Sequence, residues 1–171
     1  MMNDVWRAYV YAKASRDVYI ELAAEDPAAG TGMLGKLKHC LYGTRDAAKS
    51  WQETLSAQLI SIGFARGVGH PAVFYHAGRD IMTFVHGDGY LSSGVQEDLD
   101  WLEEKLSASY EMQTQKIGTG QGCEREGKVL NRIVRYIEQG YELEADPRHA
   151  ELIIEQLGVG GCRPVITPGI D

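Results

Sequence analysis

Apolar residues recur along the first third of the chain with two different periods. Residues 5–11 and 18–22 are rich in β-branched and aromatic side chains, which predicts two strands joined by a polar turn. Across residues 47–62 the apolar positions instead recur every three or four residues, which predicts an amphipathic helix that ends at Gly63. The expected buried stripe of this helix is Ala48, Trp51, Leu55, Leu59 and Ile62.

The middle of the chain alternates strand and helix patterns. Residues 71–75 and 81–85 are predicted strands, and a third strand begins at Tyr90. A second helix follows, with Val95, Leu99, Leu102 and Leu106 on one face and a charged, solvated opposite face. Residues 110–116 are predicted to return as a strand.

The C-terminal third predicts a hairpin and a final helix. Residues 128–137 and 141–144 are expected to pair across a turn at Gln139-Gly140. Asp146-Pro147 predicts the helix start, because Asp is a good N-cap and Pro is tolerated at the first helical position. We expect Ile153, Ile154 and Leu157 to form the buried face of this helix, and the glycines at 158–161 to end it.

The order of strand, helix, hairpin, helix and strand predicts an α+β fold of the ferredoxin-like kind. In that fold the helices cover one face of an antiparallel sheet. We expect one domain over residues 1–163 and a linker over residues 164–171. The pattern alone suits a small binding domain as well as an enzyme.

Composition narrows the class of protein. The chain has 171 residues, 44% of them hydrophobic, and lacks an apolar run long enough to cross a membrane. The three cysteines show no Cys-x-x-Cys spacing, and no secretory leader is evident, so we expect a reduced intracellular protein without a membrane partner. The net charge of −7 argues against strong nucleic-acid binding by this chain alone, because phosphate contacts require a basic face.

The segment Phe84-Val85-His86-Gly87-Asp88-Gly89-Tyr90-Leu91 places one carboxylate between two glycines and two apolar runs. Asp-Gly is a strong hairpin signal, so an ordinary tight turn explains this segment well. The same hairpin could also hold a divalent cation if a neighbouring strand supplied a second carboxylate. Both interpretations remain open from the hairpin alone.

Three motifs together resemble the reverse transcriptases of copia-type retrotransposons, in the order that this family has them. Asp4-Val5-Trp6-Arg7-Ala8-Tyr9-Val10 resembles the segment with the first catalytic Asp. Leu41-Tyr42-Gly43 through Trp51 resembles the platform under template and nucleotide, and His86-Gly87-Asp88-Gly89 resembles the catalytic hairpin. Further similarity at Val18-Tyr19-Ile20-Glu21, Ser61-Ile62-Gly63-Phe64 and Val165-Ile166-Thr167-Pro168-Gly169 extends it over nearly the whole chain.

The resemblance implies a reverse-transcriptase palm and a set of site residues. Asp4 and Asp88 would be the catalytic and metal-binding carboxylates for two Mg²⁺ ions. The residues implied in binding template, primer and deoxynucleotide are Tyr42, Gly43, Arg45, Lys49 and His86. His86 could instead be a packing residue, since imidazole matches Mg²⁺ poorly, and Trp51 is expected in the core.

Several positions depart from the family pattern. Gly89 stands where the family has its third Asp, and Asp46 places a negative charge near the expected template path. Segments corresponding to the family's fingers and ribonuclease H region are not expected in this chain. The resemblance therefore implies an RNA-directed DNA polymerase fragment with impaired catalysis. The alternative is a ferredoxin-like interaction module without enzymatic activity.

Overall fold

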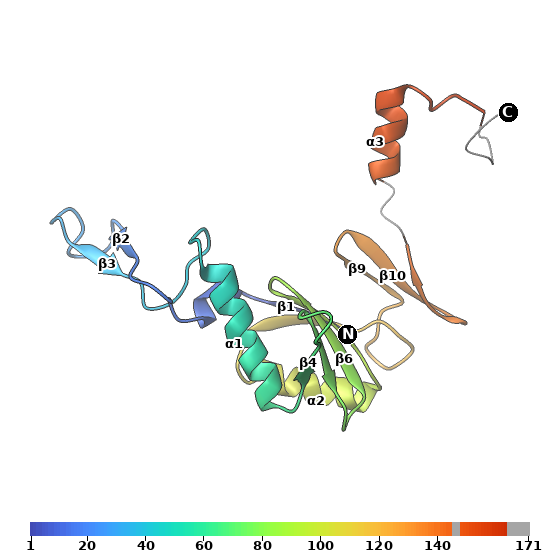
Figure 1. Ribbon diagram of the computed structural model, residues 1–171, viewed down its shortest axis with the longest axis horizontal. Coiled ribbons are helices and arrows are strands. Elements are labelled where there is room, and N and C mark those ends of the chain that lie inside the picture. The colour runs from blue at the N-terminus through green and yellow to red at the C-terminus, as the bar shows by residue number, and fades with distance from the viewer. Residues whose placement is uncertain (145–147, 164–171) are drawn as a thin grey trace. The chain divides into compact units, whose positions relative to one another are not determined.

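The computed structural model describes residues 1–144 and 148–163 (Figure 1). The chain divides into two compact units, the first comprising residues 1–116 and 120–124 and the second residues 117–119 and 125 onward. The single palm-like domain over residues 1–163 stays a prediction, and the expected linker over residues 164–171 lies outside the described residues. The predicted α+β class is confirmed, because helices and antiparallel sheets make up both units.

The first unit is built on a six-stranded sheet in the order β4-β5-β6-β7-β1-β8. Every neighbouring pair is antiparallel. The N-terminal strand β1 therefore lies between β7 and β8, which come from the middle of the chain. The strands are β1 (Met2–Val5), β4 (Ala65–Arg66), β5 (Val73–His76), β6 (Ile81–His86), β7 (Gly89–Ser93) and β8 (Met112–Gln115).

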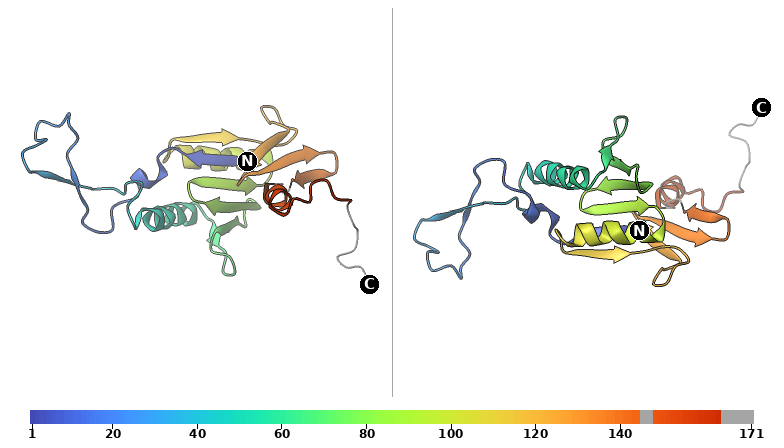
Figure 2. Two further views of the ribbon diagram at one scale, coloured as in Figure 1. Left: turned by 90° about the horizontal axis from the view of Figure 1, so that it is seen from above. Right: turned by 90° about the horizontal axis from the view of Figure 1, so that it is seen from below.

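Two helices, α1 (Ala47–Ser61) and α2 (Gln96–Ser107), bury their apolar faces in one core with one face of this sheet. In Figure 2, α2 lies behind the sheet in the view from above and in front of it in the view from below. The predicted stripe of α1 is confirmed at Trp51, Leu55 and Leu59, whereas Ala48 is exposed. The sheet residues alternate accordingly, as in β6, where Ile81, Thr83 and Val85 are buried and Met82 and His86 are exposed.

The strand expected over residues 5–11 is wrong, because β1 ends at Val5. Arg7 has a left-handed backbone with φ of 52°, and residues Ala8–Tyr11 form a short 3-10 helix, η1. Ala8 and Ala12 are both fully buried. Buried residues four positions apart lie on the same side of a helical turn. The segment therefore buries Ala8 and Ala12 by forming a helical turn, whereas a strand was expected.

The second predicted strand, over residues 18–22, is present in shortened form and pairs outside the six-stranded sheet. Strand β2 (Tyr19–Glu21) is antiparallel to β3 (Leu34–Lys36), a strand that the sequence did not predict. Further backbone bonds, including Ala14 N–H to the Lys38 carbonyl and Cys40 N–H to the Ala12 carbonyl, continue the pairing toward the body of the unit. The result is a two-stranded arm (blue in Figure 2).

The second unit contains a three-stranded antiparallel sheet and a helix. The sheet order is β11-β10-β9, from β9 (Glu126–Val129), β10 (Arg132–Ile137) and β11 (Gly140–Leu143). The single strand expected over residues 128–137 is thus split in two. Leu130 and Asn131 both have positive φ, of 47° and 65°, which is the backbone of a tight two-residue hairpin turn.

The last helix, α3 (Arg148–Leu157), ends before Gly158, whose φ of 64° is that of a helix-terminating glycine. Its expected start at Asp146-Pro147 lies outside the described residues. The expected buried face is wrong, since Ile153, Ile154 and Leu157 are 56%, 44% and 69% exposed. Periodicity identified the apolar stripe correctly, but a stripe cannot reveal whether anything packs against it. Among the described residues, no helix is long and apolar enough to cross a membrane.

Candidate functional site: a carboxylate pair at a hairpin tip

The β6–β7 hairpin turns through only two residues, Gly87 and Asp88. Gly87 has φ of 62°, a left-handed conformation at the first central position, which is where a type II′ turn requires glycine. Open space surrounds the position that a Cβ of Gly87 would take, so conformation and not crowding selects glycine here. Asp88 is half-buried at the end of this rigid turn.

Strand β1 brings Asp4 beside the same tip. Asp4 is the register partner of Gly89 on β7 and of Gln113 on β8. The Val5 N–H donates to the Asp88 carbonyl at 3.0 Å, and the Ser92 N–H donates to the Met1 carbonyl at 2.8 Å. Because bonded and non-bonded pairs alternate in an antiparallel ladder, Asp4 and Gly89 form a non-bonded pair, whose Cα atoms are typically about 4.5 Å apart. The strand of Asp4 was expected beside the strand that ends near Asp88, which is β6. Strand β1 instead neighbours β7, the second strand of the hairpin whose turn contains Asp88.

The electrostatics agree with this proximity. Partial burial raises the pKa of Asp4 above its ordinary value, and the negative charge of Asp88 raises it further. Partial burial also raises the pKa of the Tyr42 hydroxyl, again with a second contribution from Asp88. Asp4, Asp88 and Tyr42 therefore share one neighbourhood, although 84 residues separate the first two in sequence.

Tyr42 and Gly43 form an exposed shelf. The Tyr42 ring stacks on Tyr9 with centroids 4.3 Å apart and planes 25° from parallel. Gly43 has φ of 87° and open space at its Cβ position. A planar group could reach the Gly43 backbone and one exposed ring together. Tyr9 is a site residue that the sequence did not single out, because residues 5–11 were expected to be a strand.

Trp51 is a second residue whose importance the sequence understated. It is buried as expected, at 1% exposure, but its Nε1–H also donates to the Gly87 carbonyl at 2.9 Å. This bond joins the predicted platform segment to the predicted catalytic hairpin. The conspicuous Trp at the end of the platform motif was a signal, but its partner lies 36 residues away.

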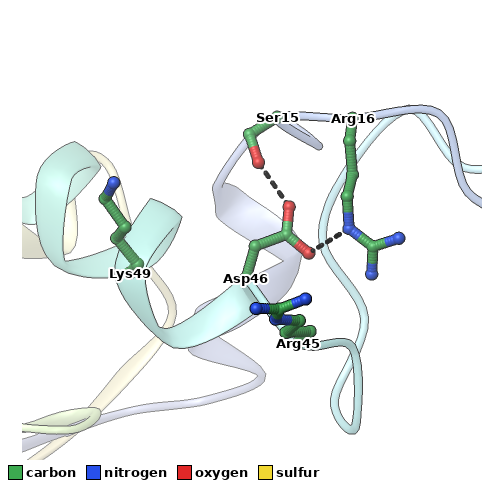
Figure 3. Close-up of a pocket in the computed structure, with 5 residues that line it drawn as sticks. All are labelled: Ser15, Arg16, Arg45, Asp46 and Lys49. Carbon is green, nitrogen blue, oxygen red and sulfur yellow. Dashed lines mark hydrogen bonds and ion pairs between the residues drawn. The ribbon is translucent and has the colours of Figure 1, made fainter.

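Arg45 and Lys49 line a different feature, an open cavity of about 390 Å³ at the start of α1 (Figure 3). Its other lining residues are Ser15, Arg16 and Asp46. The Asp46 carboxylate accepts hydrogen bonds from the Ser15 hydroxyl and, at 3.0 Å, from Arg16 Nε. These bonds, that of Ser15 first, hold the pKa of Asp46 below its usual range. The negative charge expected near a template path is thus countered by Arg16.

The cavity is positively charged overall. Three cations and one carboxylate line it, although Lys49 also lies 3.8 Å from Glu53 on the next turn of α1. In Figure 3 the Lys49 amine points away from Asp46 along the helix. The structure therefore groups Arg45 and Lys49 with Arg16, while Asp4, Asp88 and Tyr42 form the other cluster.

His86 lies in the row of the carboxylate pair. It is the register partner of Gly89, which in turn pairs with Asp4, so the three residues share the exposed face of the sheet. The His86 ring stacks on Phe84, with centroids 6.4 Å apart and planes 20° from parallel. This stacking supports the packing role that was one of its two expected roles.

The donors at the tip suit one divalent cation better than two. Carboxylate oxygens are the hard ligands that Mg²⁺ prefers, and Asp4 on β1 and Asp88 in the β6–β7 turn would supply them. Across residues 1–144 and 148–163, however, no three His, Cys, Asp or Glu side chains gather as a metal-binding group. A third carboxylate would have to come from position 89, which is occupied by Gly89 and lies directly opposite Asp4. Neither a protein-family model nor a solved structure matches this chain.

The raised pKa of Asp4 predicts a pH-dependent effect on stability. The folded chain holds the Asp4 proton more tightly than the unfolded chain does, so this contribution favours folding below the ordinary pKa of 3.8 and is lost as pH rises through the raised value. We expect Asp4→Asn to increase the free energy of unfolding at neutral pH by about 0.5 kcal/mol, a small gain because solvent screens this site. Urea unfolding should show the gain near neutral pH and little difference near pH 3. A loss of stability at neutral pH would contradict it.

Proposed function

We propose that this chain is the palm region of a copia-type reverse transcriptase, a fragment of a retrotransposon polyprotein. The observation that carries the proposal is the placement of Asp4, on β1, beside the β6–β7 turn that contains Asp88. Only the resemblance motivated that pairing, because nothing in either segment alone links two residues so far apart in sequence.

The topology supports the same proposal. When the insertions η1, β2 and β3 after β1 and the strands β4 and β5 after α1 are set aside, the remaining elements of the first unit are β1, α1, β6, β7, α2 and β8. Their order along the chain is strand, helix, two strands, helix and strand. Their order in the sheet, β6-β7-β1-β8, is that of a ferredoxin-like split β-α-β unit, extended at one edge by β5 and β4. In such a unit the first strand is central, so a residue on β1 naturally meets the turn between the second and third strands.

The residues can then be given roles in nucleotidyl transfer. Asp4 and Asp88 would hold Mg²⁺, which when bound helps deprotonate the primer 3′-hydroxyl and neutralises the triphosphate. Tyr42 and Gly43 would support the templating base pair on their exposed shelf. Arg45 and Lys49, with Arg16, would contact backbone phosphates through the positively charged cavity.

Gly89 limits this chemistry. Two closely spaced dications need bridging carboxylates, and the tip has two where the family has three. Loss of one such electrostatic contact commonly lowers kcat by about 10²–10³. We therefore propose that the chain is catalytically impaired as it stands.

Primer extension with template, deoxynucleotides and Mg²⁺ or Mn²⁺ tests the proposal. We expect no incorporation by the wild-type chain, and incorporation about a hundredfold above background by Gly89→Asp. Adding Asp4→Asn to that variant should abolish it. Wild-type activity that depends on Asp4 would show that Gly89 is not limiting. Absence of product from every variant, together with absence of Mn²⁺ binding, would favour the interaction module.

A further inference from the structure

The indole of Trp51 connects helix α1 to the tip of the β6–β7 hairpin. Its ring is held in the core by edge-on contact with Tyr110, at 5.2 Å between centroids and 77° between planes, and by a tilted contact with Tyr11 at 6.4 Å. An indole has a single hydrogen-bond donor. With the ring fixed in this way, that donor is directed at one acceptor, the Gly87 carbonyl.

Both carbonyls of the two-residue turn are thereby bonded to other elements. The Gly87 carbonyl accepts from α1 through Trp51, and the Asp88 carbonyl accepts from Val5 N–H, next to Asp4 in the chain. Gly87 is the residue with the most backbone freedom in this turn. The bond from Trp51 restrains the peptide that directly precedes Asp88.

We propose that Trp51 is a positioning residue that fixes the Asp88 carboxylate relative to Asp4 for binding a divalent cation. This inference rests on the proposed metal site. Carboxylate ligands bind a cation well only when neighbouring groups hold them in place. Here the neighbouring group is the Trp51 indole, which bonds the backbone next to Asp88 and not its carboxylate. The backbone bond from the indole supplies this support.

Trp51→Phe tests the role, because Phe preserves an aromatic ring in the core and removes the donor. Mn²⁺ binding to the full chain, followed by electron paramagnetic resonance of the free ion, should show a Kd about three- to tenfold weaker in this variant. Leu59→Val is the control. Leu59 is equally buried on α1, about two turns away, so this variant loses core packing without touching the hairpin. Its Mn²⁺ affinity should match that of the wild type.

Amide hydrogen exchange gives a second readout that does not require metal. The Val5 N–H should exchange faster in Trp51→Phe than in Leu59→Val, because the turn that accepts its bond is released. In the wild-type chain, added Mg²⁺ should also shift the Nε1–H resonance of Trp51 and leave that of Trp101 unchanged. This last measurement needs no variant to fold.

The outcomes separate the two proposals. Wild-type Mn²⁺ binding that is insensitive to Asp88→Asn overturns the proposed metal site, and Val5 exchange then decides alone whether Trp51 restrains the turn. Asp88-dependent binding that is equally tight in Trp51→Phe overturns the positioning role. Equal losses of affinity in Trp51→Phe and Leu59→Val also overturn it, since general destabilisation would then explain both.

Discussion

Gly89→Asp should bind Mn²⁺ about ten- to a hundredfold more tightly than the wild-type chain, because it adds a carboxylate directly opposite Asp4. Residues 4 and 89 form a non-bonded cross-strand pair, whose Cβ atoms lie about 4.5–5.5 Å apart. That spacing lets two carboxylates share one ion. A Cβ at Gly89 meets only the backbone oxygens of His86 and Asn3, at 3.5 and 3.7 Å, which are ordinary contacts.

The backbone of Gly89 also permits the change, since Gly89 is not among the glycines with positive φ. Without metal the added charge repels Asp4 and Asp88, so we expect Gly89→Asp to unfold at a lower temperature than the wild type. Saturating Mn²⁺ should reverse the order of the two melting temperatures, because at the same free ion concentration the chain that binds the ion more tightly is stabilised more, with the logarithm of its affinity. Isothermal titration and thermal unfolding measure the two effects.

Gly89→Asn is the matched control for this prediction. It adds a side chain of the same shape to the same position without the charge, so it should neither raise Mn²⁺ affinity nor lower the metal-free melting temperature as far. Equal behaviour of the Asp and Asn variants would mean that position 89 does not face a cation. The proposed role of Asp4 as a metal ligand would then lose its support.

Local patterns predicted much of the first unit. Residues 81–85, 47–62 and 110–116 contain a strand, a helix and a strand as expected. In the first two of these segments one face is buried, and periodicity records burial. The hairpin at Asp88 followed from its glycines. The approach of Asp4 to the hairpin that contains Asp88 was expected only through the resemblance, since the pairing of distant strands leaves little trace in a single sequence. The direct neighbour of β1 in that hairpin is β7, whereas the strand that ends near Asp88, β6, was expected there.

The errors have a common physical origin. The η1 turn at residues 8–11 and the exposed face of α3 both depend on what lies against an apolar segment, and a sequence does not state that. The hydrogen bond from the Trp51 indole to the Gly87 carbonyl was also missed. Every residue has a backbone carbonyl, so the sequence does not show which one lies against the indole. Arg16 was missed as the partner of Asp46 because the intervening arm could not be foreseen.

A buried aliphatic residue should contribute much more to the free energy of unfolding than an exposed one, even when both belong to helices of the same unit. Leu102 on α2 is fully buried, whereas Ile60 on α1 is 53% exposed, and both are long aliphatic residues in helices of the first unit. Leu102→Ala should lower the free energy of unfolding by about 2–5 kcal/mol, because it leaves a cavity between α2 and the sheet. Ile60→Ala should change it by less than about 0.5 kcal/mol, because Ala is the better helix former and little burial is lost.

Urea unfolding followed by tryptophan fluorescence measures both variants in the same unit, since Trp6, Trp51 and Trp101 all belong to it. The two substitutions remove the same number of carbon atoms, so their difference reports packing and not side-chain size. A loss at Leu102 as small as that at Ile60 would mean that α2 does not pack against the sheet. The core beneath β6 and β7 would then be incomplete, and the hairpin would lack the rigid base on which the carboxylate pair depends.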